Sequence, residues 1–175
     1  DANRMTEAKD AILFLQSHHA YVKQWLHFTG HQDAHLRVTH HDTKISNVLF
    51  KDDAAICVID LDTTMPGYFI SDVGDMCRTY LCPVNEACQD LNQIKVLPER
   101  WTAIQEGYLK AMGEFLTSFE KDHFKFSGQC IIYMQALRFL TDFLELDRYY
   151  RVERPGQNLD RTNNQIQLLK EFNQL

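Results

Sequence analysis

The sequence predicts a mainly α-helical domain that carries a small β-hairpin, an α+β fold. Long stretches keep an apolar residue at every third or fourth position, which is the helical period. Two short β-rich runs, 48–50 and 55–59, flank the polar turn Lys51-Asp52-Asp53 and predict the hairpin. The 175 residues are enough for one core, and no linker interrupts them. We therefore expect residues 1–175 to form a single domain.

Helices are predicted on both sides of the hairpin. A long amphipathic helix is expected to begin near Thr6, with this residue or a neighbour as its cap, and to continue to about Gly30. Ser71 or Asp72 is expected to cap another helix. The remaining helices are predicted at about 98–116, with Pro98 in the first turn, at about 127–147 and at about 158–175.

Two short segments complete the prediction. Leu36-Arg37-Val38 is expected to be a strand that leads into the segment His40–Asn47. Thr64-Met65-Pro66-Gly67 is expected to be a loop, because Pro and Gly both interrupt regular structure. These two segments flank the predicted hairpin in the sequence.

Composition and charge exclude several classes of function. The net charge is −6, which argues against nucleic acid as the main partner, because a phosphate backbone requires a basic surface. No apolar run approaches the roughly 20 residues that span a membrane, and the first residues lack the apolar middle of a signal peptide. The five cysteines form no CxxC pair, so reduced thiols in the cytoplasm are expected. Cys57 and Cys130 lie in apolar segments and are predicted to be core residues.

The segment from His40 to Asp60 carries side chains that suit phosphoryl transfer. An Asp in a loop accepts a proton from a hydroxyl group or orients it for attack. An Asn five residues later, and an Asp at the end of a following strand, offer oxygen ligands to Mg²⁺. A Lys beside them contacts the transferred phosphoryl group as a point charge. Asp42, Lys44, Asn47 and Asp60 follow the order of the kinase catalytic loop and metal-binding Asp.

The loop alone has a simpler explanation. Asp42 and Asn47 are also residues that cap the local backbone in turns. The predicted hairpin between Asn47 and Asp60 favours the phosphoryl-transfer interpretation, because it lies where the kinase arrangement places one.

A family resemblance follows from these motifs. His40-x-Asp42-x-x-x-x-Asn47 with Ile59-Asp60-Leu61-Asp62 resembles the aminoglycoside phosphotransferase and choline kinase group. Protein kinases carry Arg before the first Asp and Phe-Gly after the second, where this chain has His41 and Leu61-Asp62. Segments 37–50, 58–67 and 72–78, with Arg138–Leu144 and Arg154–Arg161, are similar to the N-acetylhexosamine 1-kinases. The resemblance covers about residues 35 to 165.

The resemblance implies a fold and an activity. The chain would be the C-terminal lobe of the protein kinase-like fold, which binds substrate and carries the catalytic loop. The N-terminal nucleotide lobe is expected to be absent, because about 35 residues with a single glycine, Gly30, precede the loop. The activity implied is transfer of the γ-phosphate of ATP, with Mg²⁺, to the anomeric hydroxyl of an N-acetylhexosamine. We expect this lobe to be inactive alone, with the sugar, ATP and the missing lobe as its partners.

The resemblance also implies a role for individual residues. Asp42 would be the catalytic base, with Lys44 near the γ-phosphate. Asn47 and Asp60 would hold magnesium. The remaining assignments are sugar contacts from Arg138 and Tyr149, a metal or substrate contact from Asp62, and bracing of the catalytic loop by Asp72.

Several of these assignments have alternatives. Arg138 could instead form an ion pair with Asp142, four residues on in the same helix. Tyr150 could replace Tyr149, or both rings could cap the core. Asp62 could hydrogen-bond only the local loop. For the whole chain, the alternatives are a kinase of another small alcohol, such as choline, an aminoglycoside or another hexose, and a non-catalytic pseudokinase-like binding module.

Overall fold

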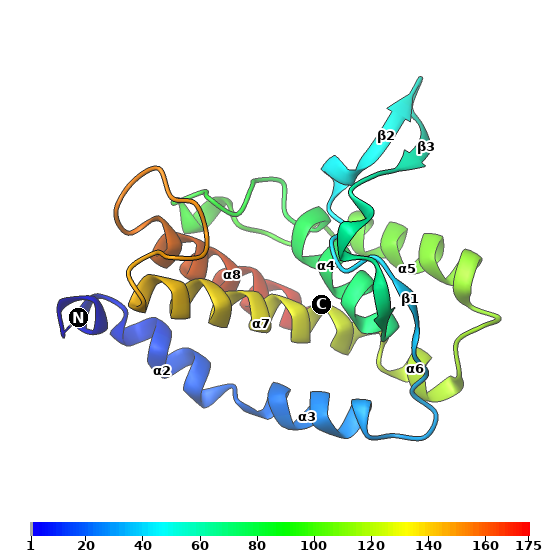
Figure 1. The fold of residues 1–175 in the computed structure, drawn as a ribbon, viewed down its shortest axis with the longest axis horizontal. Helices are drawn as coiled ribbons and strands as arrows, with labels where there is room; N and C mark the ends of the chain where they lie inside the picture. Colours follow the sequence, from blue (N-terminus) through cyan, green and yellow to red (C-terminus); the bar gives the residue numbers. More distant parts are fainter. Residues whose placement is uncertain (1) are drawn as a thin grey trace.

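The computed structural model describes residues 2–175, so Asp1, the first residue of the predicted single domain, lies outside the described part. The predicted fold class is confirmed: the chain is mainly helical and carries two small antiparallel sheets (Figure 1). The elements in chain order are α1 (Ala2–Glu7), α2 (Lys9–Ser17), α3 (Ala20–Thr29), β1 (Arg37–Thr39), β2 (Val48–Lys51), β3 (Ala54–Val58), β4 (Met65–Gly67), α4 (Phe69–Tyr80), α5 (Pro98–Met112), α6 (Ser118–Asp122), α7 (Phe124–Leu144) and α8 (Gln157–Asn173).

The helix α7 lies at the centre of the helical body, packed along α4 and α8. Two glycines allow this close packing. A Cβ atom on Gly74 of α4 would collide with Ile131 and with the backbone of Ser127 in α7. A Cβ atom on Gly128 of α7 would lie 2.6 Å from the Phe172 ring in α8. These helices can therefore pack this closely only because glycine has no side chain at the two contact points.

The N-terminal helices α2 and α3 also pack against α7. The sequence predicted one helix from Thr6 to about Gly30, whereas the chain is already helical at Ala2 and forms three segments. The clearest interruption is the turn at His18-His19, where α2 ends and α3 begins. Leu15 of α2 and Phe28 of α3 are fully buried, so both segments still bring apolar residues to the core.

The prediction of a loop at Thr64–Gly67 was wrong. Met65–Gly67 forms β4, which pairs antiparallel with β1 and places Pro66 opposite Val38. A two-stranded sheet consists of edge strands, and an edge strand tolerates the missing N–H of proline. Gly67 is buried, and a Cβ atom there would lie 2.6 Å from the His41 ring. This small sheet therefore lies against the start of the segment His40–Asn47.

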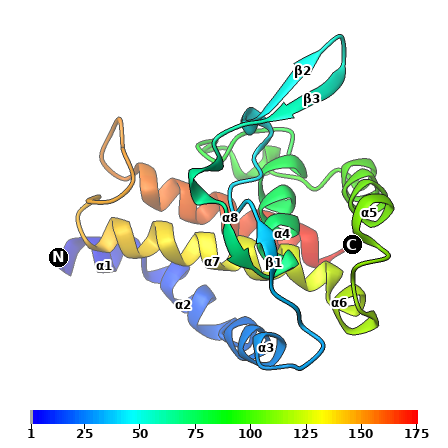
Figure 2. The ribbon, with the colours of Figure 1, turned by 45° about the vertical axis from the view of Figure 1, so that its right-hand side comes forward.

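The predicted hairpin is confirmed, since β2 and β3 pair antiparallel across the turn at Asp52-Asp53. Both turn residues have positive φ angles of 49° and 65°, which Asp tolerates better than most residues. The hairpin projects from the helical body and is exposed along both strands (Figure 2). Cys57 is exposed there, so its predicted place in the core was wrong, while Cys130 in α7 is buried as predicted.

The later helices differ from prediction mainly at their ends. α4 begins at Phe69 with Tyr68 as the N-cap residue, so neither Ser71 nor Asp72 is its cap. Pro98 does open α5. The short helix α6 was not predicted; Thr117 and Glu120 form a capping box at its start. Among residues 2–175, no helix is both long and apolar enough to cross a bilayer.

Candidate functional site

The segment His40–Asn47 is held in place by Asp72 of α4. The Asp72 carboxylate accepts hydrogen bonds from the backbone N–H groups of His40 and His41, at 3.0 and 2.8 Å. The Thr43 hydroxyl donates to the Asp72 carbonyl oxygen at 2.9 Å. Asp72 therefore has the bracing geometry expected from the sequence; it lies inside the first turn of α4, after the cap position at Tyr68.

Asp42 and its neighbours form a compact polar cluster. The Lys44 ammonium lies 2.5 Å from Asp42 Oδ2, and Asn47 Nδ2 donates to the same oxygen at 3.0 Å. Asn47 is buried in a short 3₁₀ helix, Ile45–Asn47, which turns its amide back toward Asp42. Within the described residues, no hydrogen bond reaches Asp42 Oδ1. One oxygen of the carboxylate is fixed, and the other is left for a ligand.

The electrostatics of this cluster keep Asp42 ionised. Burial by itself would raise the pKa of Asp42, but hydrogen bonds from Lys44 and Asn47 and the Lys44 charge outweigh it, so the pKa lies below its ordinary value. The same hydrogen bond raises the pKa of Lys44. Both groups are therefore charged at neutral pH, and the positive end of Lys44 lies directly beside the carboxylate.

Asp60 and Asp62 form an exposed acidic pair beside the loop. Asp60 has a positive φ angle of 63°, and the backbone N–H of Ile59 donates to the Asn47 carbonyl oxygen at 2.9 Å, which ties the end of β3 to the loop. The pKa of Asp60 is raised because its carboxyl shares a hydrogen bond with Asp62 and lies beside that charge. Lys44 Nζ is 3.9 Å from Asp60 Oδ2. Lys44 thus lies between Asp42 and Asp60.

The donor set fits Mg²⁺. Asn47 uses its Nδ2 atom for Asp42, which leaves Oδ1 as a neutral oxygen ligand, and Asp60 offers carboxyl oxygens. Among residues 2–175 there is no cluster of three His, Cys, Asp or Glu side chains that could hold a metal. A cation at Asn47 and Asp60 would need further oxygens from water and phosphate, which is the usual arrangement for Mg²⁺. For Asp62, no hydrogen bond to Thr63 or Thr64 is found in the described part of the chain.

A second polar network supports the loop from α4, and sequence reasoning missed it. Asp75 Oδ2 accepts from the Thr43 hydroxyl at 3.3 Å, and Asp75 Oδ1 pairs with Arg78 at 2.8 Å. Arg78 also contacts Glu86 at 2.6 Å. The Tyr80 hydroxyl donates to the Thr43 carbonyl oxygen. The spacing of Asp75 and Arg78, three residues apart on one helix, was the available signal.

The sequence matches the profile of a known protein family. The sequence profile of the phosphotransferase enzyme family (APH) matches residues 2–95, more than half of the chain. The chain belongs to this phosphotransferase family. The match includes Asp42, Lys44, Asn47 and Asp60 and ends before Arg138. The aminoglycoside phosphotransferase and choline kinase-like relationship expected from the motifs is therefore confirmed, and the finer N-acetylhexosamine assignment is taken up below.

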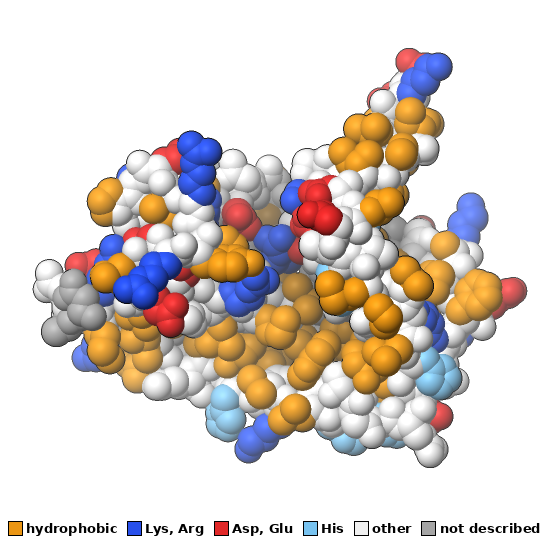
Figure 3. Space-filling view, viewed as in Figure 1, with side chains coloured by type: hydrophobic (Ala, Val, Ile, Leu, Met, Phe, Trp, Pro, Cys, Tyr) orange, Lys and Arg blue, Asp and Glu red, His pale blue; other side chains and the backbone are white. Residues whose placement is uncertain are grey.

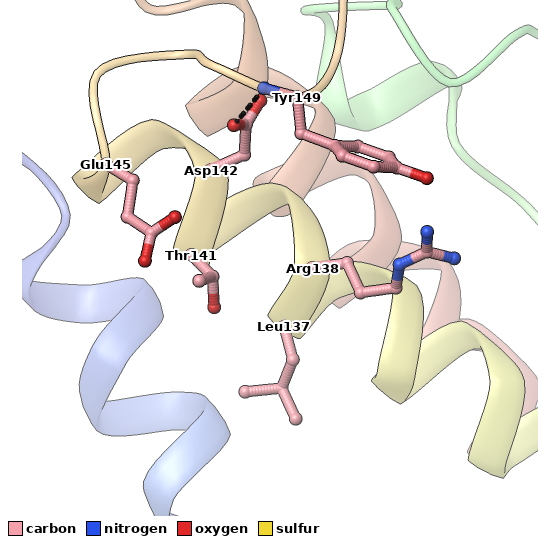
Figure 4. A pocket seen from close by; sticks show the side chains of 6 residues that line it. All are labelled: Leu137, Arg138, Thr141, Asp142, Glu145 and Tyr149. Carbon is pink, nitrogen blue, oxygen red and sulfur yellow. Dashed lines mark hydrogen bonds between the residues drawn. The ribbon is translucent and has the colours of Figure 1, made fainter.

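Arg138 and Tyr149 of this phosphotransferase line a common cavity, the outer pocket, of about 350 Å³ (Figure 4). The Arg138 guanidinium lies 5.7 Å from the centre of the Tyr149 ring. Tyr149 is 74% exposed. The residues that line the outer pocket are Leu137, Arg138, Thr141, Asp142, Glu145 and Tyr149.

The alternative ion pair between Arg138 and Asp142 is not formed. The buried Asp142 carboxylate instead accepts from the backbone N–H groups of Tyr149 and Tyr150, at 2.7 and 2.9 Å. Asn158 Nδ2 of α8 donates to it at 2.8 Å. Asp142 therefore anchors the loop after α7, and Arg138 has no ion pair within residues 2–175.

Tyr149 and Tyr150 have different environments. Tyr150 packs against Phe139 with ring centres 4.8 Å apart, and its hydroxyl accepts a hydrogen bond from Gln135 at 3.1 Å. The Tyr149 ring points into the outer pocket instead (Figure 4). Of the two alternatives, Tyr149 is the one placed to contact a ligand.

A smaller cavity, the inner pocket, of about 200 Å³, lies between the segment His40–Asn47, α4 and α7. His41 lines it from the loop, and Arg138 lines both pockets. In the space-filling view, a hollow with basic side chains inside separates the acidic group at the base of β2–β3 from the loop after α7 (Figure 3). The inner pocket therefore lies beside the loop that carries Asp42, and Arg138 connects it to the outer pocket. The residues that line the inner pocket are His41, Ser71, Asp75, Ile131, Met134, Gln135 and Arg138.

Proposed function

We propose that this chain binds the acceptor and carries the catalytic loop of an ATP-dependent, Mg²⁺-dependent kinase that phosphorylates the anomeric hydroxyl of an N-acetylhexosamine. The observation that carries the proposal is the geometry of Asp42. One of its oxygens is held by Lys44 and Asn47, and the other is unpaired among residues 2–175 and available to an acceptor hydroxyl.

Asp42 orients the acceptor hydroxyl and accepts its proton as the new bond forms between the acceptor oxygen and the γ-phosphorus. The bond from that phosphorus to the bridging oxygen of ADP breaks in the same step. Because the pKa of Asp42 is lowered, its role is mainly to orient the hydroxyl and to take the proton late. Lys44, between Asp42 and Asp60, places a positive charge where the transferred phosphoryl group would pass.

Asn47 and Asp60 are proposed as the magnesium ligands, with Asp62 as a second acidic group beside them. The bound ion would neutralise charge on the phosphate oxygens of ATP. The described residues before the loop form α1–α3 and β1, and none of them is a glycine-rich phosphate loop. Efficient turnover is therefore proposed to require a nucleotide-binding lobe that these residues do not supply.

Arg138 favours a neutral acceptor over a cationic one in the inner pocket. The carboxylate that lines this pocket, Asp75, is paired with Arg78, so the Arg138 charge would repel the ammonium groups of choline or an aminoglycoside there. A sugar hydroxyl or acetamido oxygen would accept its hydrogen bonds. The exposed Tyr149 ring, beside Arg138, offers an apolar surface to a sugar ring or an acetamido methyl group.

The test is a coupled ATP-turnover assay on the natural protein that contains this chain. The acceptor panel consists of N-acetylhexosamines, hexoses and amino alcohols. Fastest turnover with N-acetylglucosamine or N-acetylgalactosamine is expected. Fastest turnover with an amino alcohol would keep the phosphotransferase and discard the sugar assignment. Absence of turnover with every acceptor would favour a non-catalytic binding module.

The Asp42→Asn variant tests the catalytic assignment. It keeps the shape of the side chain but removes the proton acceptor, so kcat is expected to fall by about 10²–10⁴-fold. Asp53→Asn is the matched control, because Asp53 lies in the exposed hairpin turn and Asn tolerates its positive φ angle. Retention of kcat within a few-fold in Asp42→Asn would exclude Asp42 as the base.

A further inference from the structure

A third cavity, the hairpin pocket, lies between the β2–β3 hairpin, α4 and α5. Phe50 lines it from β2, Tyr80 from α4 and Tyr108 from α5. It shares no lining residue with the inner or the outer pocket. Its volume of about 760 Å³ lies in the range of pockets that bind small molecules. The hairpin pocket is therefore large enough for a ligand of its own.

The lining of the hairpin pocket is almost entirely apolar. Met76 and Met112 lie beside the three rings, and methionine side chains adapt to the shape of an apolar ligand. Gly107 of α5 also lines the pocket, and no atom lies within 4 Å of the position that a Cβ would take there. Phe50 is 52% exposed, so part of its ring is not covered by the protein. These surfaces suit the apolar body of a ligand.

Arg100 supplies the charge of the hairpin pocket. Its Nη1 atom donates to the carbonyl oxygens of Tyr80 and Cys82, at 2.8 and 2.7 Å, which fixes the guanidinium at the end of α4. Within residues 2–175, Nε and Nη2 donate no hydrogen bond, Arg100 forms no ion pair, and no Asp or Glu lines the pocket. Carbonyl oxygens carry only partial charge, so the guanidinium remains positive. Two parallel N–H groups of a guanidinium match the two oxygens of one carboxylate.

Tyr80 connects the hairpin pocket to the loop that carries Asp42. Its ring lines the pocket, and its hydroxyl donates to the Thr43 carbonyl oxygen. Burial raises the pKa of Tyr80 to about 12, so the hydroxyl remains a donor at neutral pH. A molecule in the pocket would therefore touch a side chain that holds the backbone between Asp42 and Lys44.

We propose that the hairpin pocket binds a small molecule that has an apolar body and one carboxylate group. The carboxylate pairs with Arg100, and the body lies along α5, against Phe50 and Tyr80. The site is separate from the phosphoryl-transfer residues, so its occupancy is measured without ATP or an acceptor. Failure of the proposed kinase activity would leave this binding unaffected.

The test is calorimetric titration of the 175-residue chain with decanoate, which has an unbranched apolar body and one carboxylate. Decyltrimethylammonium has the same body and the opposite charge, and acetate has the carboxylate without the body. Decanoate is expected to bind at least about tenfold more tightly than either one, because only decanoate satisfies both the apolar lining and Arg100. No binding of decanoate, or equal affinity for decyltrimethylammonium, would overturn the proposal.

Two variants locate the site. Arg100→Gln removes the charge and is expected to weaken decanoate about tenfold, with Lys110→Gln, elsewhere on α5, as its control. Gly107→Leu places a side chain in the open space of the pocket and is expected to weaken decanoate at least about tenfold. Thr102→Leu adds the same side chain at an exposed position of α5 that does not line the pocket, so affinity should not change.

Both losses together are required by the proposal. A loss in Gly107→Leu alone would show an apolar site that does not recognise the carboxylate, and a loss in Arg100→Gln alone would show an ion pair at the surface. Either result, or unchanged affinity in both variants, would contradict the hairpin pocket as the binding site of an apolar carboxylate.

Discussion

The helical body and the β2–β3 hairpin are built on opposite principles. In the body, α7 is packed so closely against α4 and α8 that Gly74 and Gly128 leave no space for a methyl group. In the hairpin, Ile56 is 61% exposed and neither strand buries a residue. The two regions therefore have different roles. Dispersion and apolar burial stabilise the body, whereas the hairpin connects Asn47 to Asp60 and contributes no residue to the core.

The catalytic loop lies between these two regions and depends on neither kind of packing. It is fixed by charge-assisted hydrogen bonds from its backbone N–H groups to the Asp72 carboxylate and by the Asp75–Arg78 pair, and all three side chains belong to α4. The helical body thus positions the loop through polar side chains of α4. Substitutions in the body should therefore lower the free energy of unfolding most, and substitutions in the hairpin should lower it least.

The largest effect on stability is expected from Gly74→Ala. The new methyl group would collide with Ile131 and with the backbone of Ser127, which cannot rotate away. Separating α4 from α7 is expected to cost about 3 kcal/mol of unfolding free energy. Urea denaturation followed by circular dichroism measures this loss.

Gly107→Ala is the matched control for that experiment. Gly107 lies in α5, and no atom lies within 4 Å of the position that a Cβ would take. Alanine is a better helix former than glycine, so this variant is expected to gain about 0.5–1 kcal/mol. Equal stability of the two variants would show that the α4–α7 contact yields easily and that the body is not tightly packed.

The comparison also explains what could be predicted from the sequence. The β-rich runs 48–50 and 55–59 around a polar turn predicted the hairpin, and the motif order from Asp42 to Asp60 predicted the polar cluster, because local spacing determines both. The β1–β4 pair was missed because it depends on contact between residues about 28 positions apart, and Pro66 and Gly67 locally favour a loop. The pairing of Asp142 with the loop at Tyr149 was missed for the same reason, since a backbone N–H partner leaves no trace in side-chain patterns.

A moderate effect is expected where the body meets β1. The buried Glu120 carboxylate in α6 contacts Arg37 of β1 at 2.5 and 2.8 Å and accepts the backbone N–H groups of His35 and Thr117. Burial raises the pKa of Glu120, but these bonds outweigh it, so the pKa lies below 4.5. Glu120→Gln is expected to lose about 2–3 kcal/mol at pH 7.

The pH dependence of that loss follows from the direction of the shift. A carboxyl group whose pKa is lowered by folding stabilises the protein above its unfolded value, here 4.5, and loses this contribution as the pH falls through the folded value. The stability difference between wild type and Glu120→Gln should therefore shrink below pH 4.5, as measured by denaturation at several pH values. Exposed Glu99 serves as the control, with a small and nearly pH-independent change for Glu99→Gln. A difference that stays constant down to pH 3 would contradict the ionised pair.

The smallest effects on the free energy of unfolding are expected from two variants that each remove one methyl group, one in the body and one in the hairpin. Ile132→Val, in the fully buried part of α7, should cost about 1 kcal/mol, because it leaves a cavity that the packed helices cannot close. Ile56→Val in the hairpin should cost less than about 0.5 kcal/mol, because water already reaches the side chain and both residues suit a strand. Urea denaturation of both variants with the wild type measures the two costs. If Ile56→Val proved as costly as Ile132→Val, the hairpin would have to be covered by another surface in solution, and the contrast between the two regions would fail.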